Sequence, residues 1–109
     1  MFVDRILKLK MLGRAFELAI RVFFPEGAGN NWTCRYEIDW PEGRQAIAAT
    51  GIDGLQALSN ALCMIGADLY TSSYHKEGQI QHWGDWKGYG FPVPAVIRDL
   101  LVGDDAKYF

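Results

Sequence analysis

The chain has 109 residues, of which 50% are hydrophobic and 22% are charged, and this composition is typical of a folded domain rather than a disordered segment. Its formal net charge at pH 7 is −2 and its 11 basic residues are scattered, so it lacks the basic cluster that nucleic-acid binding requires. We expect a single domain, residues 1–109, and no membrane partner, because no apolar run approaches the roughly 20 residues of a membrane-spanning helix.

The N-terminal sequence and the two cysteines indicate the cellular compartment in which we expect the protein. The first residues alternate in polarity and contain no apolar core of a signal peptide, so we expect a cytoplasmic protein. Cys34 and Cys63 have apolar neighbours, and two cysteines make no disulfide framework. We therefore expect both thiols to be buried and unpaired.

The first half of the chain predicts four strands. Residues 4–12 alternate between apolar and basic side chains, which favours a strand at a sheet edge, where lysines discourage pairing with other chains. Residues 15–24 predict the second strand, residues 32–40 the third strand, and residues 44–50 the fourth strand. Residues 32–40 give the clearest pattern, with polar side chains on one face and apolar side chains on the other. The apolar face consists of Trp32, Cys34, Tyr36, Ile38 and Trp40.

One amphipathic helix is expected after these strands, ending at residues 70–74. Asp53 is a favourable N-cap, and Gln56 lies three residues later, so the carboxylate can accept from the Gln56 amide while the Gln56 side chain reaches back. Gly66 inside the helix indicates close packing or a weak point. The apolar stripe consists of Leu55, Leu58, Leu62, Ile65 and Leu69. We predict that its central members, Leu58, Leu62 and Ile65, pack against the apolar face of strand 32–40.

The remaining sequence predicts a short strand at residues 79–83, an irregular stretch rich in glycine and aromatic residues at 84–94, and a short helix at 95–102. The predicted fold class is therefore α+β. It is an antiparallel meander of about four strands packed against one long amphipathic helix, with a short C-terminal segment.

The sequence contains no strong catalytic or metal-binding motif. His75, Glu77, His82 and Asp85 are close in sequence, but their spacing matches no common ligand pattern. No serine or cysteine has the sequence context of an activated nucleophile, and residues 84–91 fit neither a P-loop nor a dinucleotide fingerprint. We therefore predict no metal, no cofactor and no catalytic residue.

The best candidate functional stretch follows the short strand. Tryptophan and tyrosine dominate interface hot spots, so we predict that this stretch binds a protein partner. The alternative is that its aromatic side chains cover the open edge of the helix–sheet core. The predicted partner-binding residues are Trp83, Asp85, Trp86, Lys87 and Tyr89.

The segment Gly51-Ile52-Asp53-Gly54-Leu55-Gln56-Ala57-Leu58, preceded by residues 32–38 and followed by Gly90-Phe91-Pro92, resembles a family of small bacterial domains of uncharacterised function. The resemblance spans about residues 4–94. Domains of this kind resemble immunity proteins, which block a polymorphic toxin by binding it. The resemblance implies a non-enzymatic binding protein that neutralises a cognate toxin, and it brings no catalytic residue.

Two alternatives remain open at this point. The first is a small enzyme or small-ligand-binding domain that uses His75, His82 and the aromatic stretch as a pocket. The second is a homodimeric structural module whose exposed sheet face carries Thr33, Arg35, Glu37 and Asp39.

Overall fold

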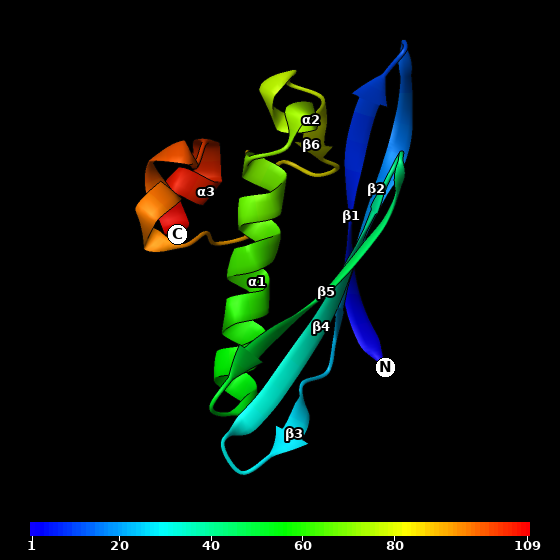
Figure 1. Ribbon diagram of the computed structural model, residues 1–109. Helices are drawn as coiled ribbons and strands as arrows, with labels where there is room; N and C mark the ends of the chain where they lie inside the picture. The colour runs from blue at the N-terminus through cyan, green and yellow to red at the C-terminus, as the bar shows by residue number, and fades with distance from the viewer. The chain divides into compact units, whose positions relative to one another are not determined.

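The computed structural model describes residues 1–109 and has an α+β fold with an antiparallel sheet of six strands and a few helices, as Figure 1 shows. The strands are β1 (Phe2–Met11), β2 (Arg14–Phe23), β3 (Glu26–Ala28), β4 (Asn31–Trp40), β5 (Gly43–Gly51) and β6 (Ile80–His82). The helices are α1 (Gly54–Tyr70), α2 (Ser73–Lys76), the 3-10 helix η1 (Ala95–Leu100) and α3 (Gly103–Tyr108).

The predicted fold class is confirmed, but the sequence analysis expected too few elements. The short strand predicted at residues 79–83 is β6, and the short helix predicted at residues 95–102 is η1. About four strands and one long helix were expected in the main layers, whereas β3, α2 and α3 are also present. β3 has three residues and α2 has four, so neither is long enough for a period in the hydrophobic pattern to stand out. None of the helices is both long and apolar enough to cross a membrane.

The strand order in the sheet is β3-β4-β2-β1-β6, and β5 pairs with β4. β1 is therefore an internal strand, so the prediction that it forms an edge is wrong. Its lysines lie on the wet face of the strand, and an alternating pattern reports which face is wet rather than which strand lies at the edge. A two-residue turn, Leu12-Gly13, joins β1 to β2, and both residues have the positive φ (55° and 72°) that a type I′ turn requires.

The chain forms two compact units: unit 1 contains residues 1–5 and 19–62, and unit 2 contains residues 6–18 and 63–109. β1, β2 and α1 each contribute residues to both units.

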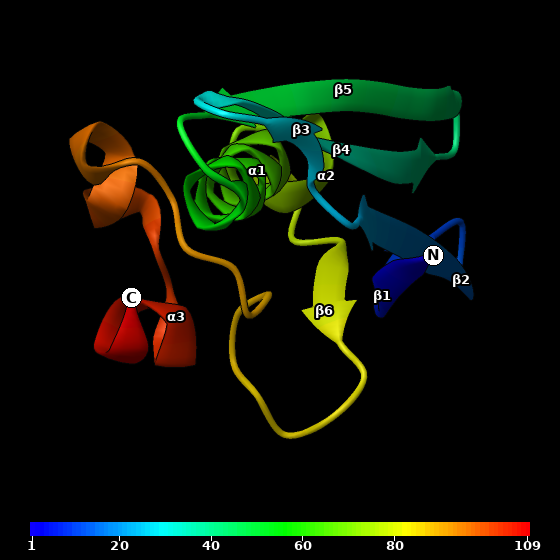
Figure 2. The same ribbon diagram turned by 90° about the horizontal axis from the view of Figure 1, so that it is seen from below.

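Unit 1 is built on the β4–β5 hairpin, whose register runs from Trp32 opposite Gly51 to Trp40 opposite Gly43. The predicted apolar face of β4 is confirmed. Its three central members, Cys34, Tyr36 and Ile38, are each 0% exposed. Figures 1 and 2 both place the first turns of α1 beside β5, and the Asn60 side chain donates to the Thr50 carbonyl at 2.8 Å.

The buried face of α1 differs from the predicted leucine stripe. Ile65 and Leu69 are buried as expected, but Leu58 and Leu62 are half-buried and Leu55 is 79% exposed. The fully buried positions in the first half of the helix are Ala57 and Ala61. Small side chains let a helix approach neighbouring backbone closely, and the backbone of Gly51 lies against that of Ala57 with no room for a Cβ. A pattern of large apolar residues cannot show where alanine is the contact residue.

Unit 2 joins the second half of α1 to the C-terminal segment. β6 pairs with β1 from Leu7 opposite His82 to Leu9 opposite Ile80, and both leucines are buried. Gly66 faces the Pro92 carbonyl so closely that no Cβ would fit, which confirms the close packing that Gly66 indicated.

The helix start of α1 has the predicted capping geometry. Asp53 Oδ1 accepts from the Gln56 amide at 2.7 Å, and Gln56 Oε1 accepts from the Ile52 amide at 2.8 Å. Two amide groups at the start of the helix are thereby satisfied.

The cysteines are both free, as predicted, but they differ in burial. Cys34 is buried and its thiol donates to the Phe23 carbonyl at 3.3 Å, whereas Cys63 is half-buried, so the prediction of full burial is wrong for Cys63. Burial raises the pKa of both thiols, which lowers their reactivity at neutral pH.

We expect Ile65→Ala to lower the free energy of unfolding by about 2–5 kcal/mol, because it removes buried methyl groups and leaves a cavity. Leu55→Ala is the matched control in the same helix and should change it by no more than about 0.5 kcal/mol, because Leu55 is exposed. Urea unfolding followed by circular dichroism measures both values. Equal losses in the two variants would contradict the buried face described here.

Asp53→Ala should destabilise the protein by about 0.5–2 kcal/mol, since the Gln56 amide loses its acceptor. Asp53→Asn should cost less, because the asparagine oxygen also caps a helix. Ser59→Ala, at an exposed position of the same helix, serves as the control for a general effect of alanine. A stable Asp53→Ala variant would show that the cap contributes nothing to folding.

Candidate functional site

The stretch that the sequence singled out forms a long irregular loop after β6, which Figure 2 shows as the yellow to orange segment. We call residues 83–91 the aromatic loop. The loop belongs to unit 2, as do the residues that hold it in place. Its conformation depends on a carboxylate from the C-terminal helix α3.

Asp105 is 0% exposed and accepts four hydrogen bonds. Its Oδ1 accepts from Trp86 Nε1 at 2.6 Å and from the Gly90 amide at 2.9 Å. Its Oδ2 accepts from the Tyr70 hydroxyl at 2.5 Å and from the Tyr89 amide at 2.7 Å. A carboxylate offers about four acceptor positions, so these donors fill its capacity.

The backbone of the loop is also fixed next to this carboxylate. Gly88 has φ +118° and packs against the Asp105 carboxyl group, where a Cβ would collide. The Lys87 amide donates to Asp104 Oδ2 at 2.7 Å, and the Lys87 carbonyl accepts from the Asp104 amide at 2.6 Å. The start of α3 therefore holds the middle of the loop from both its N–H and its C=O side.

The predicted site residues divide into two groups. Trp83 is 52% exposed, and Asp85 and Lys87 are exposed. Trp86 is half-buried and bonded to Asp105, while Tyr89 is 4% exposed. The exposed group can meet a partner, whereas Trp86 and Tyr89 position the loop.

The two histidines lie in different surroundings. His75 Nδ1 shares a hydrogen bond with the Tyr89 hydroxyl, and its ring packs edge-on against Tyr70. Burial lowers the pKa of His75, so the ring is neutral at neutral pH. His82 lies instead at the end of β6, where its Nδ1 accepts from the Gly84 amide at 3.0 Å.

The buried tyrosines keep their protons. The pKa of Tyr70 is raised above its ordinary value, mainly by burial and also by the hydrogen bond to Asp105. Burial and, to a smaller extent, the charge of Asp105 raise the pKa of Tyr89 to about 12. Tyr70 therefore remains a donor to Asp105 throughout the neutral range.

A pocket of about 390 Å³ lies between β6, the aromatic loop and β1, all in unit 2. Lys8 comes from β1, and its Nζ lies 5.2 Å from the centroid of the Trp83 ring. His82 also lines this pocket, and His75 does not. Sequence reasoning missed Lys8, Val102 and Asp105, because each reaches the loop from a distant part of the chain. The main side chains of the pocket are Lys8, His82, Trp83, Trp86, Lys87 and Tyr89.

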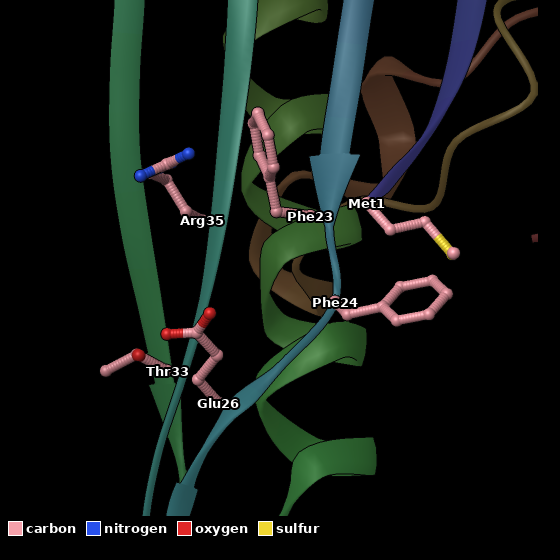
Figure 3. Close-up of a pocket in the computed structure, with 6 residues that line it drawn as sticks. All are labelled: Met1, Phe23, Phe24, Glu26, Thr33 and Arg35. Carbon is pink, nitrogen blue, oxygen red and sulfur yellow. The ribbon is translucent and has the colours of Figure 1, made fainter.

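Unit 1 has a pocket of its own, of about 280 Å³, which Figure 3 shows. Met1 and Phe24 lie on one side of it, and Arg35, Glu26 and Thr33 lie on the other. The Arg35 guanidinium lies 4.1 Å from the centroid of the Phe23 ring, within the range of a cation–π interaction. Opposite charges line this pocket, so it favours no ligand charge.

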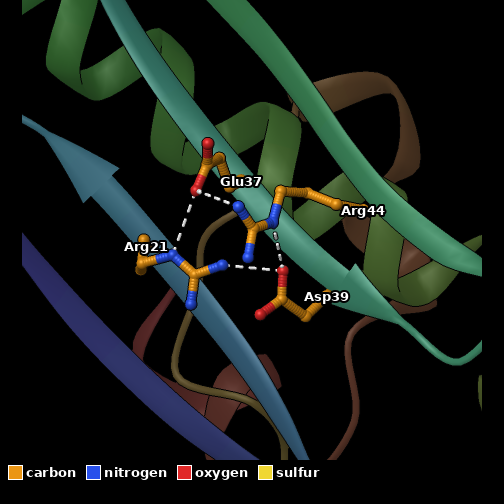
Figure 4. Close-up of polar contacts among 4 residues, drawn as sticks. All are labelled: Arg21, Glu37, Asp39 and Arg44. Atoms are coloured by element: carbon orange, nitrogen blue, oxygen red, sulfur yellow. Dashed lines mark hydrogen bonds and ion pairs between the residues drawn. The ribbon is translucent and has the colours of Figure 1, made fainter.

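The polar face of unit 1 carries a cluster of ion pairs, drawn in Figure 4. Arg21 binds Glu37 at 3.0 Å and Asp39 at 2.7 Å, and Arg44 binds Asp39 at 2.8 Å. The hydrogen bond from Arg21 lowers the pKa of Asp39. The cluster joins β2, β4 and β5 across the sheet, and its charges neutralise one another.

Nowhere in the chain do three or more His, Cys, Asp or Glu side chains gather in a way that could hold a metal ion.

Asp105→Ala should lower the free energy of unfolding by about 3 kcal/mol or more, because it leaves buried donors of Tyr70, Trp86 and the loop without an acceptor. Asp104→Ala, which removes one bond to the Lys87 amide, is the neighbouring control and should cost only about 1 kcal/mol. Chemical unfolding measures both. Similar losses for the two variants would show that the buried carboxylate does not hold the loop.

Comparison with known proteins gives one match. A family model described as Domain of unknown function (DUF6968) matches residues 3–93. Neither the curated proteins nor the solved structures contain a match. The matched segment includes the aromatic loop but ends before Asp104 and Asp105, which hold that loop. Since the match covers most of the 109 residues, the chain belongs to the DUF6968 family.

Proposed function

We propose that the chain is a non-enzymatic bacterial binding protein of the immunity class, which neutralises a cognate toxin by direct contact. The contact surface is the exposed part of the aromatic loop, formed by Trp83, Asp85 and Lys87. Trp86 and Tyr89 do not touch the partner in this proposal. They hold the loop in the conformation that binds.

The observation that carries the proposal is that the loop is fixed on its inner side and exposed on its outer side. Asp105 takes up the donors of Trp86, Tyr89 and Gly90, while Trp83 stays 52% exposed. A loop that is already ordered loses little conformational entropy on binding, so more of the contact energy appears as affinity.

The chemistry of the exposed group also fits an interface. An exposed tryptophan with exposed charged residues in the same loop has the composition of an interface anchor with a polar rim. The net charge of −2 and the isoelectric point near 5.6 favour approach to a basic partner surface.

Trp83→Ala should leave the melting temperature nearly unchanged and weaken binding by about 2 kcal/mol or more, a loss of roughly 30-fold in affinity. The binding partner for the test is the product of the neighbouring gene, expressed as an inactive variant and titrated by calorimetry. Asp85→Lys should also weaken binding, by reversing a charge at the rim.

Val96→Ala is the matched control, since Val96 is an apolar residue of unit 2 that is 88% exposed and lies outside the loop. It should bind like the unaltered protein. If the unaltered protein did not bind this gene product, or if Trp83→Ala bound it equally well, the proposal would be wrong.

A further inference from the structure

We propose that the pocket of unit 2 binds a small planar organic anion, meaning a flat ring that carries one carboxylate or phosphate group. This inference concerns the chain alone and does not rest on a protein partner. The volume of about 390 Å³ falls at the lower end of the range of roughly 300–1,000 Å³ in which small-molecule sites lie.

The charge of the pocket lining selects an anion. Lys8, Lys87 and His82 line the pocket, and no aspartate or glutamate does. The protein as a whole has a net charge of −2, so two lysines in one pocket without an acidic residue run against its overall balance. The two acidic residues that support the loop, Asp104 and Asp105, already accept bonds from the loop.

Lys8 is held in place without an acidic partner. The ion pairs among Arg21, Glu37, Asp39 and Arg44 lie in unit 1, and none of them involves Lys8. Its ammonium group instead lies over the Trp83 ring at 5.2 Å. A cation–π contact leaves hydrogen-bond donors of the ammonium group available, and these can bind a carboxylate or a phosphate.

His82 adds a directed donor. Its Nδ1 accepts from the Gly84 amide, so in the neutral ring the proton must be on Nε2. The second nitrogen, Nε2, is therefore a hydrogen-bond donor. Lys8 and His82 thus both present donors and neither presents a free acceptor.

The aromatic side chains select a planar group. Trp83 and Trp86 both line the pocket, and the bond from Trp86 to Asp105 fixes the orientation of its indole. A flat ring can contact the parts of the two indoles that line the pocket, and this contact adds to the binding of the charged group. A single anionic group joined to a flat ring system is therefore the ligand chemistry that the pocket fits.

The test uses the purified chain and two matched pairs of probes. Benzoate is compared with benzamide, and adenosine monophosphate with adenosine, because each pair differs in charge but keeps the ring. Calorimetric titration gives affinities, and the indole N–H signal of Trp83 in the NMR spectrum reports whether binding occurs at this pocket. We expect at least one anion to bind saturably and to shift the Trp83 signal, and its neutral counterpart to bind at least about tenfold more weakly.

Two lysine variants test whether Lys8 binds the anion. Lys8→Met keeps the length of the side chain and removes its charge, and should weaken anion binding by at least about tenfold. Lys10→Met is the matched control, because Lys10 lies two residues along the same strand and does not line the pocket. It should bind the anion as the unaltered protein does, and melting curves show whether both variants are folded.

Each other result overturns the inference. Equal binding of the charged and neutral probes would remove the role of the cationic lining, and equal binding by Lys8→Met would remove Lys8 from the site. Inorganic phosphate that bound as tightly as adenosine monophosphate would show that the aromatic side chains do not contribute. The absence of saturable binding by either anion would rule out the class of ligand. Preference for benzoate or for adenosine monophosphate distinguishes a carboxylate ligand from a phosphate ligand.

Discussion

Unit 2 depends on one buried charged group, the carboxylate of Asp105. A carboxylate without hydrogen-bond donors is very costly to bury, so the surrounding chain must supply donors or expose the group to water. Here the donors come from the end of α1 through Tyr70, and from the aromatic loop through Trp86 and two backbone amides. The same requirement therefore connects α1, the loop and α3 and gives the loop one conformation.

In this arrangement, the residues that hold the loop in place differ from the residues that are exposed for binding. The aromatic loop has too many glycines to be ordered by its own backbone preferences, because glycine loses more entropy on ordering than any other residue. The order is imposed by α3, which lies beyond the segment that the DUF6968 family model matches. In this chain the geometry of a loop inside the family segment is thus set by residues outside it.

The parts of the structure that sequence reasoning predicted correctly depend on local periodicity. Strand β4 alternates strictly, so the central members of its buried face could be identified, and Asp53 with Gln56 forms a cap within four positions of the chain. The wrong predictions concern contacts that depend on the size of a side chain or on residues far apart in the sequence. Ala57 and Ala61 carry the helix contact in place of Leu55, because close approach favours small residues over hydrophobic ones.

The candidate site was predictable only in part for the same reason. The aromatic residues stand next to one another in the sequence, so their composition indicated a functional stretch. Lys8 and Asp105 reach that stretch from opposite ends of the chain, and no local pattern distinguishes Lys8 from Lys10 or Asp105 from Asp104. Trp86 and the Tyr89 amide bind Asp105 whereas Trp83 is exposed, and the local sequence contains no signal for these bonds.

The two units use charged residues in opposite ways. In unit 1, Arg21 and Arg44 meet Glu37 and Asp39, so each charge is neutralised inside the chain and the group stabilises the sheet. Such a network leaves little binding capacity for another molecule. In unit 2, Lys8 lies over an indole and makes no ion pair, so no carboxylate of the fold neutralises its charge. The presence of charge is therefore a poor guide to function in this protein, and the absence of an internal partner is a better one, because only an unpaired cation still gains free energy by binding an anion.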